Sequence, residues 1–297
     1  MYPEYPYINF KNENLKTPVT FPAQHQNVQP GIESELNPLP IFENPDYKPS
    51  EKLKDKVAII SGGDSGIGKA VASLFAKEGA DIVIVYLNEK EDATFTKQHI
   101  EKLGRKCMAI EGNLKLEEFS KSIVNKIIED FGKIDILVNN CAVQFPQNSI
   151  LDITSEQLIN TFETNIFSYF YLTKAVLPHL PANSSIINTT SVTAFEGNQA
   201  LIDYSSTKGA ISSFTKSLAL SLADMKIRVN AVAPGPVWTP LIPSSFNEQK
   251  VESFGTNVPI KKAGQPFEIA PAYLYLACDD SRFVTGQTIH VNGGSMV

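Results

Sequence analysis

The feature that most constrains the fold is a short apolar run that leads directly into a glycine-rich turn. Residues 57–61 read Val-Ala-Ile-Ile-Ser, a composition typical of a strand buried on both faces. Glycines follow at positions 62, 66 and 68, and apolar residues recur with helical spacing through residue 79. A strand, a glycine turn and a helix in this order predict the first half of a crossover unit with a parallel sheet.

The same alternation of strand-like runs and helical segments continues to the end of the chain. Further strands are expected at residues 82–86, 107–110, 134–138, 185–189, 227–232 and 288–291. Further helices are expected at residues 89–103, 116–131, 155–180, 204–225 and 266–277. The pattern predicts an α/β fold, a Rossmann-type doubly wound sheet of seven mostly parallel strands with helices on both faces.

Residues 1–52 have a different composition and are expected to form an N-terminal arm, with the catalytic domain at residues 53–297. Nine of the 19 prolines lie in this region, and proline at that density disfavours helices and central strands. A disordered tail is one interpretation. The interleaved aromatic residues, such as Phe21, Phe42 and Tyr47, favour an extended arm that lies on the protein body or on a neighbouring subunit.

Composition and charge exclude several classes of protein. The net charge of −6 and the lack of a basic tract argue against a nucleic-acid surface. No apolar run is long enough to span a bilayer, and the N-terminus lacks the features of a signal peptide. Three cysteines without a C-x-x-C pair indicate reduced thiols, so a cytoplasmic location is expected. The four scattered histidines predict no catalytic metal.

The glycine-rich turn is expected to bind the phosphates of a dinucleotide. Gly62 allows a tight turn, Gly66 allows close approach of the pyrophosphate, and Gly68 allows the helix to pack on the strand. Contacts are expected from this turn and from the end of the next strand, at Asp64, Ser65, Ile67, Tyr86 and Leu87. Because Tyr86 stands where an acidic residue is expected, NAD and NADP both remain open. Asp64 would repel a phosphate, which tilts the prediction weakly toward NAD.

Tyr204 and Lys208 are spaced four residues apart on an expected helix, so that a phenol and an ammonium lie on one face. A nearby positive charge favours the phenolate and therefore lowers the pKa of the tyrosine. Such a tyrosine is a usable proton donor and acceptor near neutral pH.

Together, the glycine turn, the Asn-Asn pair at residues 139–140 and the Tyr-x-x-x-Lys pair resemble the short-chain dehydrogenase/reductase family, in its compact single-domain branch. The resemblance covers residues 54–297 and is closest to bacterial oxidoreductases with a proline-rich N-terminal extension. It implies that Ser191 hydrogen-bonds the substrate oxygen and that Tyr204 transfers the proton. It also implies that Lys208 binds the nicotinamide ribose, and that Asn165 holds a water in a proton relay to Lys208.

The resemblance also implies further cofactor contacts along the chain. They are Asn113, Leu114, Asn140, Cys141, Ala142, Tyr204, Lys208, Pro234, Gly235, Val237 and Thr239. Two positions depart from the family's Asn-Asn-Ala-Gly pattern, which here reads Asn-Asn-Cys-Ala at residues 139–142. Ala142 stands where the family has glycine, so its methyl group leaves less room for the cofactor to approach the backbone.

Specificity is expected from a lid-like segment at residues 241–256 and from Gln144, Phe145, Thr193, Phe195 and Trp238. The expected reaction is hydride transfer between nicotinamide and an alcohol or carbonyl group of a sugar, a polyol or a small ketone. A non-catalytic dinucleotide sensor is the alternative from another class. An enoyl reductase would space its tyrosine and lysine further apart. The resemblance implies a homotetramer or a dimer.

Overall fold

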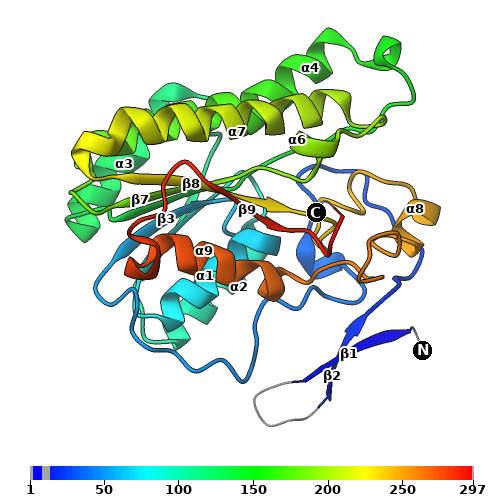
Figure 1. Ribbon diagram of the computed structural model, residues 1–297, viewed down its shortest axis with the longest axis horizontal. Helices are drawn as coiled ribbons and strands as arrows, with labels where there is room; N and C mark the ends of the chain where they lie inside the picture. The colour runs from blue at the N-terminus through cyan, green and yellow to red at the C-terminus, as the bar shows by residue number, and fades with distance from the viewer. Residues whose placement is uncertain (1–2, 9–13, 296–297) are drawn as a thin grey trace.

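The computed structural model describes residues 3–8 and 14–295 and has a central seven-stranded sheet with helices on both faces (Figure 1). The strands lie in the order β5-β4-β3-β6-β7-β8-β9, and all neighbouring pairs are parallel. Their bounds are β3 Val57–Ser61, β4 Asp81–Tyr86, β5 Cys107–Glu111, β6 Ile136–Asn139, β7 Ser185–Thr189, β8 Arg228–Pro234 and β9 Thr288–Val291. The predicted fold class is therefore confirmed.

Helices cover the sheet in two layers, and each layer has its own apolar core. One layer contains α1 Gly66–Lys77, α2 Lys90–Lys102 and α9 Pro266–Ala277, and the other contains α3 Glu117–Phe131, α5 Ser168–Val176 and α7 Ile202–Leu222 (Figure 1). Shorter helices are α4 Ser155–Phe162, α6 Thr193–Glu196 and α8 Glu248–Glu252. Single turns of 3₁₀ helix lie at η1 Glu33–Glu35, η2 Ile150–Asp152, η4 Leu177–His179, η5 Ala223–Met225 and η6 Asp279–Ser281.

The order of the strands determines where a ligand can bind. β3 lies between β4 and β6, so the chain connections leave it toward opposite edges of the sheet. In open α/β sheets, this reversal leaves a crevice outside the carboxyl ends of the strands, which is the usual ligand site. Within the described residues, no helix is both long enough and apolar enough to cross a bilayer.

The helix expected at residues 155–180 is interrupted by a wider turn. Between α4 and α5, residues Glu163–Phe167 form a π-helical segment, η3, and the chain continues through it without breaking. Asn165 lies in this segment, and its side-chain amide hydrogen-bonds both backbone groups of Val143. π-Helical turns of this kind are frequent at functional sites. Apolar spacing alone does not reveal the extra residue.

The N-terminal arm begins with a β-hairpin, a detail that the expectation of an extended arm did not specify. β1 Glu4–Ile8 pairs antiparallel with β2 Asn14–Pro18, which makes a small two-stranded sheet (Figure 1). Pro6 and Pro18 are tolerated because a two-stranded ribbon consists of edge strands only. Of the arm, positions 1–2 and 9–13 lie outside the described residues.

Beyond the hairpin, the arm crosses the protein body in contact with it. The Phe21 and Trp238 rings stack at 3.8 Å between centroids with 12° between their planes, and the Trp238 indole N–H donates to the Pro38 carbonyl at 2.8 Å. Both rings are fully buried, in a cluster with Leu36 and Ile242. Aromatic stacking with full burial is a strong contact. The arm therefore shares an apolar core with the domain.

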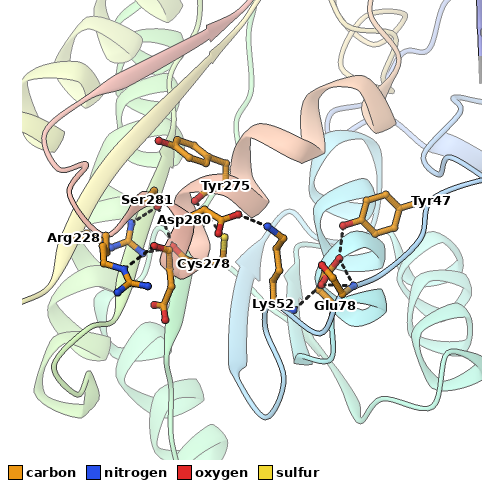
Figure 2. A network of polar contacts seen from close by, with 11 residues as sticks. Tyr47, Lys52, Glu78, Arg228, Tyr275, Cys278, Asp280 and Ser281 are labelled. Carbon is orange, nitrogen blue, oxygen red and sulfur yellow. Dashed lines mark hydrogen bonds and ion pairs between the residues drawn. The ribbon is translucent and has the colours of Figure 1, made fainter. Parts of the chain in front are cut away.

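The end of the arm is held by a second network, at the junction with the domain (Figure 2). The buried Glu78 carboxylate accepts hydrogen bonds from the Tyr47 hydroxyl and from the backbone N–H of Lys52 at 2.7 Å. The Lys52 ammonium pairs with Asp280, next to the Arg228 guanidinium, which donates to the Ser281 hydroxyl at 2.8 Å. Several donors thus satisfy a carboxylate that would be costly to bury alone.

Replacing Phe21 with alanine is expected to lower the free energy of unfolding by about 3–5 kcal/mol if the arm and domain unfold together. Denaturant titration measures this loss. Because Trp238 is the only tryptophan, its emission also reports whether the arm remains packed on it. A red shift before global unfolding is expected in the variant.

The matched control is Phe283→Ala, because the Phe283 side chain is fully exposed. The control should leave both the stability and the tryptophan emission unchanged. Equal effects of the two substitutions would contradict a shared core between the arm and the domain.

Candidate active site

A cavity of about 540 Å³ opens at the carboxyl ends of the central strands. Its size lies in the range of small-molecule and cofactor sites. Most residues predicted to bind a cofactor line it: Gly62, Asp64, Ser65, Gly66, Ile67, Tyr86, Leu87, Asn113, Leu114, Asn140, Cys141, Ala142, Tyr204, Lys208, Pro234, Gly235, Val237 and Thr239. Ser191, Gln144 and Thr193 line it too, whereas Gly68, Asn165 and Trp238 do not.

The glycine turn after β3 makes the floor of the cavity where the backbone must come close to a ligand. Gly62 has a φ of 62° and Gly66 a φ of 52°, a region that other residues rarely adopt. A Cβ on Gly68 would lie 1.9 Å from the Gly62 carbonyl oxygen, so this glycine serves the packing of α1 against the turn. A cavity of this size with a glycine floor beside a helix N-terminus fits a dinucleotide.

A carboxylate from the arm occupies one donor of that helix terminus. The Glu33 side chain accepts from the Gly66 N–H at 2.6 Å and from the Lys69 ammonium at 2.6 Å, and all three residues are buried. Burial raises the pKa of Glu33, while Lys69 and the Gly66 N–H oppose that rise. The Asp92 carboxylate in turn accepts the Glu33 backbone N–H at 2.6 Å. The arm is therefore fixed to the start of α1.

The surroundings of Asp64 in the glycine turn do not support the weak tilt toward NAD. Asp64 is fully buried, and its burial together with the charge of Glu89 raises its pKa. The Glu89 carboxylate accepts from the backbone N–H groups of Leu87 and Asn88 at 3.1 and 2.9 Å. An Asp64 held toward its neutral form does not repel a phosphate as the sequence predicted.

The loop after β6 is held against the glycine turn by an asparagine. The Asn140 side-chain amide donates to the Ser61 and Gly62 carbonyls at 3.2 and 3.1 Å, and its backbone N–H donates to the Ser61 hydroxyl at 2.9 Å. The backbone N–H of Cys141 donates to the same hydroxyl at 3.2 Å. In the loop after β5, the Asn113 side-chain oxygen accepts the Lys115 N–H at 3.0 Å. The bonds from Asn140 and Cys141 fix the loop after β6 against the glycine turn.

Ser191, Tyr204 and Lys208 converge on the cavity from β7 and α7. The Lys208 ammonium lies 5.4 Å from the centroid of the Tyr204 ring and donates to the Thr189 carbonyl at 2.9 Å. The Ser191 hydroxyl oxygen accepts from the Thr193 N–H and hydroxyl at 3.2 and 3.1 Å. A hydroxyl, a phenol and an ammonium thus share one end of the cavity.

Burial governs the protonation of this group more strongly than the charge of Lys208 does. It raises the pKa of Tyr204 to about 12, a rise that a hydrogen bond with Ser191 opposes. It lowers the pKa of Lys208 to about 8. The sequence predicted that Lys208 lowers the pKa of Tyr204. In the protein alone, burial raises that pKa instead. Both groups are instead held in their neutral forms more strongly than in water.

Asn165 lies behind the cavity wall, and the water relay that the resemblance implied stays a prediction. Its side-chain oxygen accepts the Val143 N–H at 2.8 Å, and its amide donates to the Val143 carbonyl at 2.9 Å and to the Thr207 hydroxyl at 3.2 Å. The residue is fully buried behind the cavity wall. These bonds fix the loop that carries Gln144 relative to α7.

The expectation that Trp238 contacts the substrate is wrong. The indole turns away from the cavity to stack on Phe21 and to donate to Pro38, because the arm provides an apolar surface and an acceptor there. Phe246 and Phe254 do line the cavity, from the segment at residues 241–256, together with Gln144 and Phe145.

Three arm residues line the cavity and were not predicted from the sequence: Gln29, Pro30 and Gly31. The proline and aromatic content of the arm indicated contact with the body, but no local pattern indicates where along the body the arm runs. A Cβ on Gly31 would lie 2.4 Å from the Pro240 carbonyl oxygen. In the sequence, this close approach is marked by no more than a glycine that follows a proline.

Comparison with known proteins agrees with this geometry. A family model described as enoyl-(acyl carrier protein) reductase matches residues 62–296. The NADPH-dependent aldehyde reductase 1, chloroplastic, of Arabidopsis thaliana is 50% identical over 281 residues, which are 92% of this chain and 98% of the relative. The glucose and ribitol dehydrogenase of Daucus carota is 47% identical over 283 residues, 93% and 97% of the two chains.

A solved structure shares the fold as well. A short chain dehydrogenase from Burkholderia cenocepacia J2315 in complex with NADP matches with a TM-score of 0.77 at 29% identity, over 82% of this chain and 98% of that one. The chain therefore belongs to the short-chain dehydrogenase/reductase family, and it is an oxidoreductase with an NAD(P)-binding Rossmann fold.

Replacing Lys208 with methionine is expected to stabilise the protein near pH 7. Burial lowers the pKa of Lys208 from 10.5 to about 8, so below pH 8 the folded state buries a charge at a cost on the order of 1–3 kcal/mol. The wild type recovers that stability as the pH rises from 8 toward 10.5, because only the unfolded state then holds the proton. Denaturant titrations at pH 7 and pH 10 measure the difference.

Lys216→Met is the control, because Lys216 lies exposed on the same helix. It should change stability little at either pH. A Lys208 variant that is less stable than the wild type at pH 7 would show that the bond to Thr189 outweighs the cost of burial.

Replacing Asp64 with asparagine is expected to remove part of the pH dependence of NADPH binding. Because the pKa of Asp64 is raised, the wild-type residue gains its charge only at alkaline pH and then repels the phosphates. Fluorescence titrations at pH 6.5 and pH 9 should give similar Kd values for both proteins at the lower pH and weaker wild-type binding at the higher.

Asp152→Asn, at an exposed position, is the control for a general change in net charge. Parallel pH profiles for all three proteins would mean that the Asp64 charge does not reach the ligand.

Proposed function

We propose that the protein is an NAD(P)-dependent reductase and dehydrogenase acting on CH–OH and carbonyl groups of a sugar, a polyol, an aldehyde or a small ketone. The observation that carries the proposal is the convergence of Ser191, Tyr204 and Lys208 at one end of a glycine-floored cavity. The names of the two plant relatives, an aldehyde reductase and a glucose and ribitol dehydrogenase, agree with this substrate class.

The protein groups act on the substrate oxygen and on its proton. When bound, the nicotinamide cofactor supplies or accepts the hydride. During reduction, the Ser191 and Tyr204 hydroxyls donate hydrogen bonds to the carbonyl oxygen as negative charge develops on it. Tyr204 then transfers its proton to that oxygen, which yields the alcohol. A phenol whose pKa is raised to about 12 remains protonated for this step.

Lys208 and Asn165 act behind the tyrosine. Lys208, which lines the cavity, binds the ribose of the cofactor and contributes positive charge near the phenol. Asn165 acts by position, because its amide fixes Val143 and therefore the loop that carries Gln144. The buried surroundings exclude water and strengthen each of these interactions.

The wall residues favour a polar substrate. Side-chain amides and hydroxyls from Gln144, Thr193 and Asn198 line the cavity beside the aromatic rings of Phe145 and Phe246. Amides and hydroxyls provide both donors and acceptors for substrate hydroxyl groups. Either cofactor form remains in the proposal. A homotetramer or dimer and a cytoplasmic location stay predictions from the sequence.

Replacing Tyr204 with phenylalanine is expected to lower kcat by a factor on the order of 10²–10³ or more, because the proton donor and one oxyanion donor are lost together. The Kd for the cofactor should remain within a few-fold. Absorbance of the reduced nicotinamide measures turnover, with NADH and NADPH on aldehydes, ketones and an enoyl thioester, and with NAD⁺ and NADP⁺ on sugars and polyols.

Tyr275→Phe is the control, because Tyr275 lies exposed on α9 and does not line the cavity. It should retain full turnover. A Tyr204 variant within tenfold of the wild type would exclude the proposed role. Reduction of the enoyl thioester alone would move the proposal to reduction of carbon–carbon double bonds.

A further inference from the structure

One arm residue, Gln29, joins two walls of the cavity. Its side-chain amide donates to the Gln144 carbonyl at 2.6 Å and to the Ser244 carbonyl at 3.2 Å, and its side-chain oxygen accepts the Gln144 N–H at 3.2 Å. Gln144 lies in the loop after β6, and Ser244 lies in the segment at residues 241–256. Both donor hydrogens of the amide are thus used, which fixes its orientation.

The two walls that Gln29 joins face the substrate end of the cavity. Gln144 is fixed from behind, because Asn165 holds the neighbouring Val143. The segment at residues 241–256 contributes Leu241, Ile242 and Phe246 to the lining. This segment has little regular structure beyond the single short helix α8. Its position therefore depends on contacts with other parts of the chain.

The arm supplies several of those contacts along the whole segment. The Phe21 N–H donates to the Glu252 carbonyl at 3.4 Å, and the Gln26 N–H donates to the Pro243 carbonyl at 2.8 Å. The His25 ring nitrogen lies 2.9 Å from the Phe246 carbonyl oxygen. The arm and the segment at residues 241–256 thus form one connected surface, and Gln29 is the arm residue whose side chain joins this segment to Gln144.

The arm itself is rigid on both sides of Gln29. On one side, the Gln26 side chain closes a turn by bonding both backbone groups of Ile32 at 2.8 Å. On the other, the buried Glu33 carboxylate pairs with Lys69 and the Gly66 N–H. Between them, Gly31 lies against the Pro240 carbonyl, where a Cβ would clash. Gln29 therefore projects from a fixed support rather than from a loose tail.

We propose that Gln29 is a positioning residue for the substrate, which sets the width of the substrate end of the cavity by holding Gln144 and the segment at residues 241–256 at a fixed separation. The proposal rests on the proposed function, because a substrate carbonyl must be held against Ser191 and Tyr204. A residue outside the α/β domain then determines specificity. Bulkier substrates are excluded as long as the two walls remain joined.

The test compares Gln29→Ala and Gln29→Glu with the wild type, in the full chain. Glutamate keeps the shape and the acceptor for the Gln144 N–H, but it lacks both donors and places a charge between two carbonyls. Both variants should raise KM for the preferred carbonyl substrate by about tenfold, with kcat within a few-fold and the cofactor Kd unchanged. Turnover of bulkier substrates should rise relative to the preferred one.

The matched control is Gln24→Ala. Gln24 is also a partly buried glutamine of the arm, but its side chain bonds Pro22 and Asn37 within the arm itself and does not line the cavity. The control should leave KM and the substrate preference unchanged. A KM change of the same size in the control, or wild-type KM in both Gln29 variants, would overturn the proposal.

Hydrogen–deuterium exchange gives a second readout that does not require turnover. The amides of residues 241–256 and of Gln144 should exchange faster in both Gln29 variants than in the wild type and in the control. Unchanged exchange would overturn the proposal even if KM rose. If the wild type reduces no substrate, the proposed function fails, whereas exchange still decides whether Gln29 joins the two walls. Trp238 emission verifies that each variant is folded.

Discussion

The reversal of strand order at β3 is the constraint on which the rest of the structure depends. Because the connections leave β3 toward opposite edges, the helices cannot close over the carboxyl ends of β3 and β6. The crevice that remains is lined by the glycine turn after β3, by the loop after β6, and by α7 with Tyr204 and Lys208. Gln29, Pro30 and Gly31 of the arm complete the lining.

Burial gives this site its chemistry at a cost in stability. Tyr204 and Lys208 are almost completely buried, and burial moves their pKa values in opposite directions, each toward the neutral form. A dry site strengthens every hydrogen bond to a developing oxyanion. The same desolvation disfavours the charged lysine, which the fold tolerates because Thr189 accepts its hydrogen bond. Shifted pKa values of this kind are common at functional sites.

The sequence revealed what local patterns encode and missed what distant contacts decide. Apolar spacing and glycine positions predicted all seven strands, the turn at Gly62 and the helix that carries Tyr204, since each is specified by neighbouring residues. Trp238 was misplaced because its partner, Phe21, lies over 200 positions away. The charge of Asp64 was misjudged because its burial beside Glu89 depends on folding. The π-helical turn at Asn165 adds one residue without changing the apolar pattern.

The path of the arm means that the α/β domain does not build the cavity alone. The family model begins at residue 62, yet Glu33 occupies a donor at the start of α1 and Gln29 lines the cavity. Removal of the arm at residues 1–52 would leave Lys69 as a buried ammonium without the Glu33 carboxylate, which is costly. It would also remove Gln29, Pro30 and Gly31 from the lining of the cavity. Under the proposed function, a change in the arm alone therefore alters the wall of the cavity while Ser191, Tyr204 and Lys208 stay the same.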